Sequence, residues 1–266
     1  MFIGGDESVW GMGYRAQGQG ADNCKLRRIP APDTMRNFKK VAHGKFFRLV
    51  LTEPGRLFWL GQSRKYMMGL GSSGTARLEE FHDMGENYFR IGDGDKLIDV
   101  CGGKNFTAVV TEMGKIYATS YMFWRKWADC RHNSENNEDY PFELRMPEGY
   151  KAKQIWASEK NYNLWVTGTD ANGAFKTFGG GETEAIYGTG EDTRCSVFKP
   201  FAVPDGTYMT KVTSHAHLVH GIDNNHNLWV WGSGIYGAES DEDKAILYSG
   251  ERGNASKPML MKWFKE

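Results

Sequence analysis

The segment Val212–Gly232, VTSHAHLVHGIDNNHNLWVWG, decides the fold of this chain. Apolar and polar residues alternate along it, and a polar cluster of Asp223, Asn224 and Asn225 separates two apolar runs. Alternation indicates strands with one buried face, and Asn-rich clusters are typical of tight turns. We therefore interpret the segment as one strand, a turn at the polar cluster, and a second strand that ends at Trp229–Gly232.

The same pattern occurs at three earlier places in the chain. Val41–Gly61 (VAHGKFFRLVLTEPGRLFWLG) aligns without a gap with Val100–Ser120 (VCGGKNFTAVVTEMGKIYATS), and the two starts are 59 residues apart. A third copy starts at Trp156, with an insertion in its turn, and Val212 starts the fourth, at spacings of 56 residues each. Four copies at near-constant spacing predict a repeat architecture.

Glycines recur at equivalent places in these copies. They fall where a turn or a strand end is expected, and glycine is favoured there because it adopts positive φ angles without steric cost. We expect the structural turns of the repeat at the following residues: Gly44, Gly55, Gly61, Gly103, Gly114, Gly173, Gly179 and Gly232.

A unit of ~50 to 60 residues with about four short strands has the size of a β-propeller blade. We predict an all-β fold, a single β-propeller domain over residues 1–266, because one small sheet cannot bury both of its faces alone. The hairpin repeats start near 41, 100, 156 and 212, and an N-terminal remnant, 1–32, completes a blade. With four to five blades, the chain forms either a small closed ring, in which Met1–Gly5 completes the last sheet, or an open arc.

The repeat resembles that of the regulator of chromosome condensation family. The resemblance rests on Val41-Ala42-His43-Gly44, on Leu49–Gly55, on Gly69-Leu70-Gly71 and on the fourth copy, His217–Asn225 with Trp231-Gly232. It covers nearly the whole chain and implies a propeller, usually with seven blades in that family. Its members act as nucleotide-exchange factors, light sensors and binding platforms, but no motif specific to exchange or light sensing matches residues of this chain.

Composition narrows the classes of partner. Lys plus Arg and Asp plus Glu number 33 each, so no net charge favours nucleic acid or an anionic membrane. The N-terminus lacks the basic flank and apolar run of a signal peptide. The four cysteines lie far apart without a CxxC pair, which favours reduced thiols in an intracellular, reducing compartment. Cytoplasm, cilium and mitochondrion are not distinguished.

Three patterns suggest ligand chemistry, and we favour a structural interpretation of each. His215, His217 and His220 could bind a metal, but in one extended strand the third would face away from the other two. The GxGxxG at Gly69–Gly74 lacks the βαβ context of a dinucleotide site, and GGGETE at 179–184 lacks the Lys-Ser/Thr of a P-loop. We expect no metal, no cofactor and no small-molecule ligand.

Catalytic chemistry is also not indicated. The acidic clusters, such as Glu138-Asp139 and Asp241-Glu242-Asp243, lie in expected loops, and no Gly-x-Ser-x-Gly elbow is present. We therefore expect that the protein is not an enzyme.

The second copy breaks the pattern. Where other copies have a glycine loop, it has YMFWRKWADCRH at 121–132, crowded with the aromatic and arginine residues that are enriched at protein interfaces. Alternatively, Phe123 and Trp124 fill space between blades. RNA binding is disfavoured because acidic residues follow directly. The C-terminal MLMKWF at 259–264 is a second candidate, either as a closing strand or as a hydrophobic tail docked on a neighbour. The candidate interface comprises Tyr121, Phe123, Trp124, Arg125, Trp127, Arg131, Trp263 and Phe264.

These observations predict a non-catalytic protein-interaction scaffold, an accessory structural subunit of a larger multiprotein assembly. The alternative is a regulatory binder, such as a guanine-nucleotide exchange factor for a small GTPase, which rests on the family resemblance.

Overall fold

The computed structural model of the chain describes residues 2–4, 8–11, 26–63, 76–85, 89, 91–92, 94–119, 127, 141–158, 162–181, 188–190, 197–215, 218–232 and 255–261. Every regular element among them is a β-strand. The strands form five antiparallel sheets, one with three strands and four with four. The all-β prediction is confirmed.

Sheets 1 and 2 are formed by the N-terminal third of the chain. Sheet 1 has the order β1-β2-β3 and sheet 2 the order β4-β5-β6-β7. Their strands are β1 (Phe2–Ile3), β2 (Val9–Gly11), β3 (Arg27–Ile29), β4 (Phe38–His43), β5 (Phe47–Thr52), β6 (Leu57–Ser63) and β7 (Ala76–Asp83).

Sheets 3, 4 and 5 repeat the organisation of sheet 2, with four strands that follow one another in sequence and in space. Sheet 3 has β8 (Leu97–Gly102), β9 (Thr107–Thr111), β10 (Ile116–Thr119) and β11 (Phe142–Leu144). Sheet 4 has β12 (Lys151–Ala157), β13 (Leu164–Thr169), β14 (Phe175–Gly180) and β15 (Lys199–Pro200). Sheet 5 has β16 (Met209–His215), β17 (Leu218–Asp223), β18 (Leu228–Gly232) and β19 (Ala255–Leu260).

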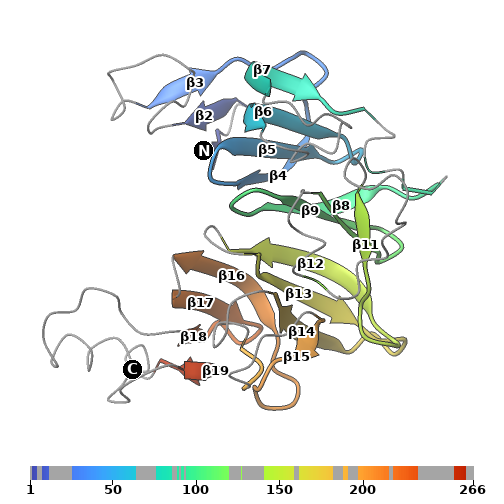
Figure 1. The fold of residues 1–266 in the computed structure, drawn as a ribbon, viewed down its shortest axis with the longest axis vertical. Helices are drawn as coiled ribbons and strands as arrows, with labels where there is room; N and C mark the ends of the chain where they lie inside the picture. Colours follow the sequence, from blue (N-terminus) through green and yellow to red (C-terminus); the bar gives the residue numbers. More distant parts are fainter. Residues whose placement is uncertain are drawn as a thin grey trace, which may run out of the picture.

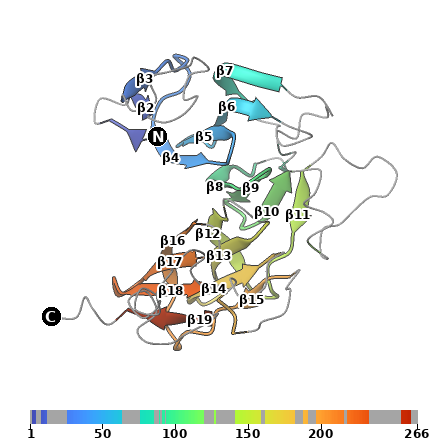
Figure 2. The ribbon, with the colours of Figure 1, turned by 60° about the vertical axis from the view of Figure 1, so that its left-hand side comes forward.

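The five sheets follow one another along an open arc (Figures 1 and 2). β1 pairs with β2, Phe2 opposite Trp10, and the outer strand of sheet 5 is β19. Of the two arrangements expected from the sequence, the structure therefore has the open arc, in which sheets 1 and 5 lie at opposite ends (Figure 1).

The described strands of the segment that starts at Val212 show one error in our sequence interpretation. We expected a single strand before the polar turn, but β16 ends at His215 and β17 begins at Leu218, and these two residues pair with each other. The alternation of side chains continues on both sides of a two-residue connection, so alternation alone does not reveal the break. The face assignment of the three histidines rested on the continuous strand, and it stays a prediction because His217 lies outside the described residues.

The hairpin turns of sheets 2, 3 and 4 each contain a glycine with positive φ: Gly55 at 87°, Gly114 at 85° and Gly173 at 83°. In sheet 5 the turn has His226 instead, at 63°. The backbone hydrogen bond is of the same kind in all four, as in Gly55 N to Thr52 O at 2.9 Å and His226 N to Asp223 O at 3.1 Å.

A second set of glycines lets neighbouring sheets approach each other. A Cβ atom at Gly44 would lie 2.5 Å from the Gly103 carbonyl oxygen, far inside van der Waals contact. The close approach is used by a hydrogen bond from the Lys45 amide to that same oxygen, at 3.3 Å. This contact explains why a side chain is not tolerated at Gly44, whereas at Gly103 a Cβ atom would clash with the ring of Phe106. Both glycines were expected as turn residues.

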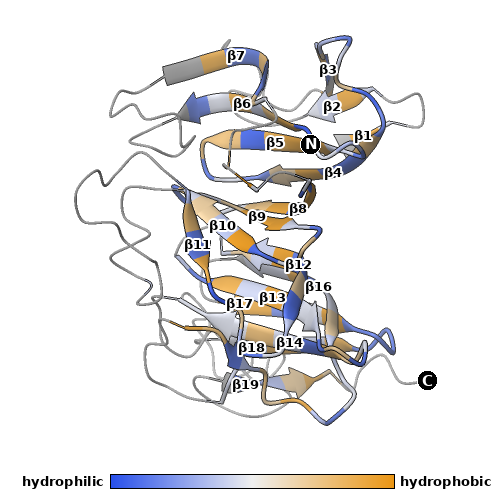
Figure 3. Ribbon diagram, turned by 90° about the vertical axis from the view of Figure 1, so that its right-hand side faces the viewer, coloured by the Kyte–Doolittle hydropathy of each residue, from blue (hydrophilic) through white to orange (hydrophobic). Residues whose placement is uncertain are grey.

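Apolar clusters join each sheet to the next. In Figure 3 the hydrophobic colour follows the strands, and the hydrophilic colour gathers towards their ends. Representative buried pairs are Val9 with Phe58 between sheets 1 and 2, Trp59 with Val109 between sheets 2 and 3, Ala108 with Ile155 between sheets 3 and 4, and Trp165 with Trp231 between sheets 4 and 5. Complete burial of a large apolar side chain stabilises the fold by about 2 kcal/mol.

Candidate functional site

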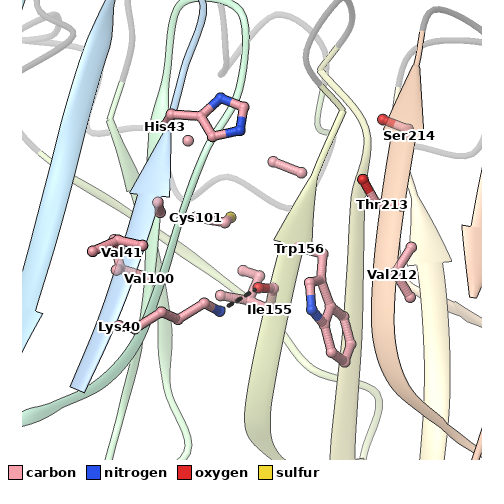
Figure 4. A pocket seen from close by; sticks show the side chains of 13 residues that line it. Lys40, Val41, His43, Val100, Cys101, Ile155, Trp156, Val212, Thr213 and Ser214 are labelled. Atoms are coloured by element: carbon pink, nitrogen blue, oxygen red, sulfur yellow. Dashed lines mark hydrogen bonds between the residues drawn. The ribbon is translucent and has the colours of Figure 1, made fainter. Parts of the chain in front are cut away.

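The first strands of sheets 2 to 5, namely β4, β8, β12 and β16, are edge strands that lie side by side on one side of the arc. We call them the inner strands. Together they line a groove of about 230 Å³ (Figure 4), to which β4 contributes residues 40–43, β8 residues 100–102, β12 residues 155–157 and β16 residues 212–214. Four separate repeats thus build one site.

Polar side chains enter this inner groove from both ends. Lys40 reaches across from β4 towards β12, and the indole of Trp156 lies between β12 and β16 (Figure 4). On β16, Thr213 is exposed, and the Ser214 hydroxyl oxygen is buried without a hydrogen-bond partner. A buried hydroxyl without a partner costs free energy, and the Ser214 oxygen has no exposed surface that a ligand in the groove could reach.

A buried carboxylate fixes the relative positions of three inner strands. Asp99 on β8 is 6 % exposed and accepts hydrogen bonds from the Lys40 ammonium at 2.6 Å and from the Ile155 amide at 2.8 Å. It also accepts from the amide of Val100 at 2.9 Å. Lys40 donates in turn to the Ile155 carbonyl oxygen at 3.4 Å. The network therefore joins sheets 2, 3 and 4 beside the groove.

The thiol of Cys101 lies in the groove wall but is not activated. Burial raises the pKa of this thiol, and only weaker contributions from Lys40 and the Ala108 backbone oppose it. A thiolate is the reactive form of cysteine, so Cys101 acts as a small apolar side chain here.

Of the predicted interface residues, only Trp127 lies among the described residues. Its side chain is 2 % exposed, its indole N–H donates to the Tyr162 carbonyl oxygen at 3.0 Å, and its ring packs 4.7 Å from that of Phe198. Trp127 therefore fills space within the chain, and its assignment to a contact surface is wrong. The remaining interface candidates lie outside the described residues: Tyr121, Phe123, Trp124, Arg125, Arg131, Trp263 and Phe264.

The described part of the chain contains no group of three or more His, Cys, Asp or Glu residues placed to hold a metal ion. His220 lies on β17 opposite Thr213, and burial lowers the pKa of its imidazole. Within the same described ranges, no helix is long and apolar enough to cross a membrane.

Sequence reasoning missed the inner groove, because its residues come from four copies and none forms a motif. One signal was present. Asp99 interrupts the apolar strand LIDVCG, and a charged residue in a buried strand requires partners that only the fold reveals.

One face of sheet 5 has no neighbouring sheet among the described residues. Val219, Trp229 and Trp231 point towards sheet 4 and belong to the apolar cluster there. Side chains alternate along strands, so their sequence neighbours occupy the opposite face. We call this the outer face of sheet 5, and it contains Leu218, His220, Ile222, Leu228, Val230 and Met259. None of these six belongs to the apolar clusters that the described residues form, although Val230 is only 2 % exposed and the other five are half-buried.

Comparisons with known proteins agree with this geometry. No protein-family profile matches the sequence, and a search of curated proteins finds no significant match. Among solved structures, human WBSCR16 superposes with a TM-score of 0.67 at 16 % identity, over 96 % of this chain. Yeast RCC1 (Prp20), solved bound to Kap60, superposes with a TM-score of 0.59 at 17 % identity, over 91 % of this chain.

The chain has the fold of the regulator of chromosome condensation propellers. The resemblance inferred from the repeat is thus confirmed at the level of the fold. A second yeast structure, Prp20p from Saccharomyces cerevisiae, superposes with a TM-score of 0.59 at 16 % identity, over 95 % of this chain. The matched region covers only 62 % of the WBSCR16 chain, 53 % of the yeast RCC1 chain and 58 % of the Prp20p chain. The open arc of this chain thus corresponds to a part of these RCC1-like chains.

Proposed function

We propose that this RCC1-like arc is a non-catalytic protein-interaction scaffold, a structural subunit of a larger multiprotein assembly in a reducing intracellular compartment. The observation that carries the proposal is the outer face of sheet 5. In sheets 2 to 4, the equivalent positions are buried against the next sheet of the arc. In sheet 5, aliphatic side chains occupy these positions, but no described sheet follows.

Two equivalent residues, Val110 in sheet 3 and Ile222 in sheet 5, show this difference in burial. Val110 on β9 pairs with Asp99, and Ile222 on β17 pairs with Lys211, the corresponding residue of β16. Val110 is completely buried against sheet 4, whereas Ile222 is only half-buried. Apolar sheet faces of this kind are typical of surfaces that another protein covers.

The groove chemistry also supports a binding role. The carboxylate of Asp99 is held by Lys40 and by two backbone amides, so it serves as a fixed acceptor rather than as a general base.

Native size tests the proposal. We expect the tagged 30.1 kDa chain to elute from size-exclusion chromatography of native extract as part of a much larger particle. Ile222→Asp should shift it towards the monomer, while Met113→Asp, at a 53 % exposed residue on the β9–β10 turn, should leave it in the particle. A wild-type chain that elutes mainly as a free monomer would refute the scaffold role.

A second candidate function is a regulatory binder, such as an exchange factor for a small GTPase. Its support is the likeness to yeast Prp20p, a protein whose binding to Gsp1p and histones has been described. The test is nucleotide release from GTPases that co-purify with the chain. No acceleration of release by the purified chain would exclude this function for those GTPases.

A further inference from the structure

The charge of the inner strands differs from that of the whole chain. The chain has equal numbers of acidic and basic residues, 33 each. The inner strands, FKKVAH, LIDVCG, KAKQIWA and MTKVTSH, contain five lysines and one acidic residue, Asp99. An otherwise neutral protein therefore has a basic inner side.

Most of this positive charge is not neutralised. Lys40 pairs with Asp99 at 2.6 Å, and Lys39 lies 3.9 Å from the Glu53 carboxylate. Lys151 and Lys211 are exposed and Lys153 is half-buried, and none of these three forms an ion pair with a described carboxylate. Two further basic side chains, His43 and Lys45, are exposed where β4 leads into β5.

The lysines and the groove are continuous along the inner strands. Lys211 on β16 corresponds to Lys40 on β4, since each follows the bulge of its strand and pairs with the next residue of the hairpin, Ile222 and Leu51. Lys40 lines the groove itself, and beyond it lie Trp156, Thr213 and Ser214. Lys153 and Lys211 thus lie on the same two strands, β12 and β16, that supply the Trp156 ring and the exposed Thr213 hydroxyl.

We propose that the inner groove binds an extended acidic segment of a partner protein, with one apolar side chain of the segment packed on Trp156. Carboxylates of the segment accept a hydrogen bond from the exposed Thr213 hydroxyl and pair with Lys153 and Lys211, which form no ion pair with a described carboxylate. This proposal rests on the scaffold function and specifies the chemistry of one partner.

Three observations favour an acidic peptide over a nucleic acid. The basic residues of the inner strands are lysines and histidines, without the arginines that recognise phosphates in bidentate fashion. One indole, Trp156, lines the groove, whereas single-stranded nucleic acids are bound by successive aromatic platforms. A groove of about 230 Å³ between edge strands accommodates a side chain and adjacent carboxylates better than a stacked base with its phosphates.

Binding to the purified full chain tests the proposal. The probe is a fluorescein-labelled peptide of about ten residues in which Glu alternates with Leu, long enough to cross several strands. We expect fluorescence anisotropy to show saturable binding that weakens with added salt. A peptide of the same length in which Lys replaces Glu should not bind.

Variants locate the site. We expect Lys153→Glu combined with Lys211→Glu to weaken binding at least about tenfold, and Trp156→Ala and Thr213→Val to weaken it by smaller factors. The matched control is Lys176→Glu, a charge reversal on β14 away from the inner strands. Circular dichroism and thermal melting identify any variant that loses its fold, and the exposed Lys211→Glu alone then serves as the charge test.

Three results would overturn the inference: absence of binding, equal loss of affinity in the Lys176→Glu control, or displacement of the peptide by a single-stranded oligonucleotide that binds more tightly. The scaffold function is tested separately, because its assay uses native particle size and the outer face of sheet 5.

Discussion

Sheets 3 and 5 have the same strand order and nearly the same register, but sheet 3 has described neighbours on both faces and sheet 5 has one on a single face. The difference is visible at equivalent positions. Cys101 and Ala108 pair on the face of sheet 3 that contacts sheet 4, and Thr213 and His220 pair at the same place in sheet 5. The repeat thus determines the backbone, and the neighbouring sheet determines how polar each side chain can be.

The largest expected effect comes from placing a charge at one pair of equivalent positions. Val110→Asp buries a carboxylate between two sheets and should destabilise the fold by about 4 kcal/mol or more. Ile222→Asp, on the outer face of sheet 5, should cost about 1 kcal/mol, because the new carboxylate remains hydrated. Urea denaturation of the two variants measures the difference. Equal costs would show that sheet 5 is covered as completely as sheet 3.

The second prediction concerns the hairpin turns. Asp223 is 1 % exposed and accepts hydrogen bonds from the Trp229 indole at 2.8 Å, from the Asn227 side chain at 3.0 Å and from two backbone amides. Burial raises the pKa of this carboxyl, but the hydrogen bonds outweigh it and hold the pKa below its ordinary value.

Asp223→Ala leaves buried donors without an acceptor and should destabilise the protein by about 3 kcal/mol. Thr111→Ala in the corresponding turn of sheet 3 removes one acceptor of the Lys115 amide, at 3.2 Å, and should cost about 1 kcal/mol. Thermal unfolding of both variants provides the comparison. A larger loss from Thr111→Ala would contradict it.

The third prediction concerns the link between sheets. Asp99→Asn removes the charge that holds Lys40 and should destabilise the fold by about 2 kcal/mol. Gln154 occupies the corresponding position on β12, where it is exposed, so Gln154→Ala should change stability by less than about 0.5 kcal/mol. Chemical denaturation distinguishes the two. If both substitutions were neutral, the Asp99 network would have no role in joining the sheets.

The smallest expected effect is a pH dependence confined to sheet 5. Burial lowers the pKa of His220, so the folded state favours the neutral imidazole. This contribution to stability is complete above the ordinary histidine pKa of about 6.5 and is lost as the pH falls from there towards the lower pKa of the folded state. His220→Gln should reduce the difference in melting temperature between about pH 7.5 and about pH 5.5. Leu218→Gln, on the same face, should keep the full difference.

The sequence predicted the repeat, the four-stranded units and the hairpin-turn glycines Gly55, Gly114 and Gly173, because each depends on local alternation and on φ angles that a few residues determine. It was wrong about three other turn residues, since Gly61 and Gly179 lie within β6 and β14 and Gly232 is the last residue of β18. It did not locate the break between His215 and Leu218, since a two-residue connection preserves the alternation. Nor did it reveal that Trp127 is buried, because an aromatic-rich loop has the same composition in a contact surface and in a core. The inner groove depends on residues from four repeats, and only the arc brings them together.

The open arc also has a consequence for how the protein unfolds. Within the described part of the chain, apolar clusters join successive sheets and no others, so opening can begin at either end and proceed inwards in steps. Lys40 is an exception, since it bonds both to Asp99 in the next sheet and to Ile155 in the sheet beyond it. Sheets 2, 3 and 4 should therefore exchange their amide hydrogens as one cooperative unit, while sheets 1 and 5 fray first and lose protection more quickly.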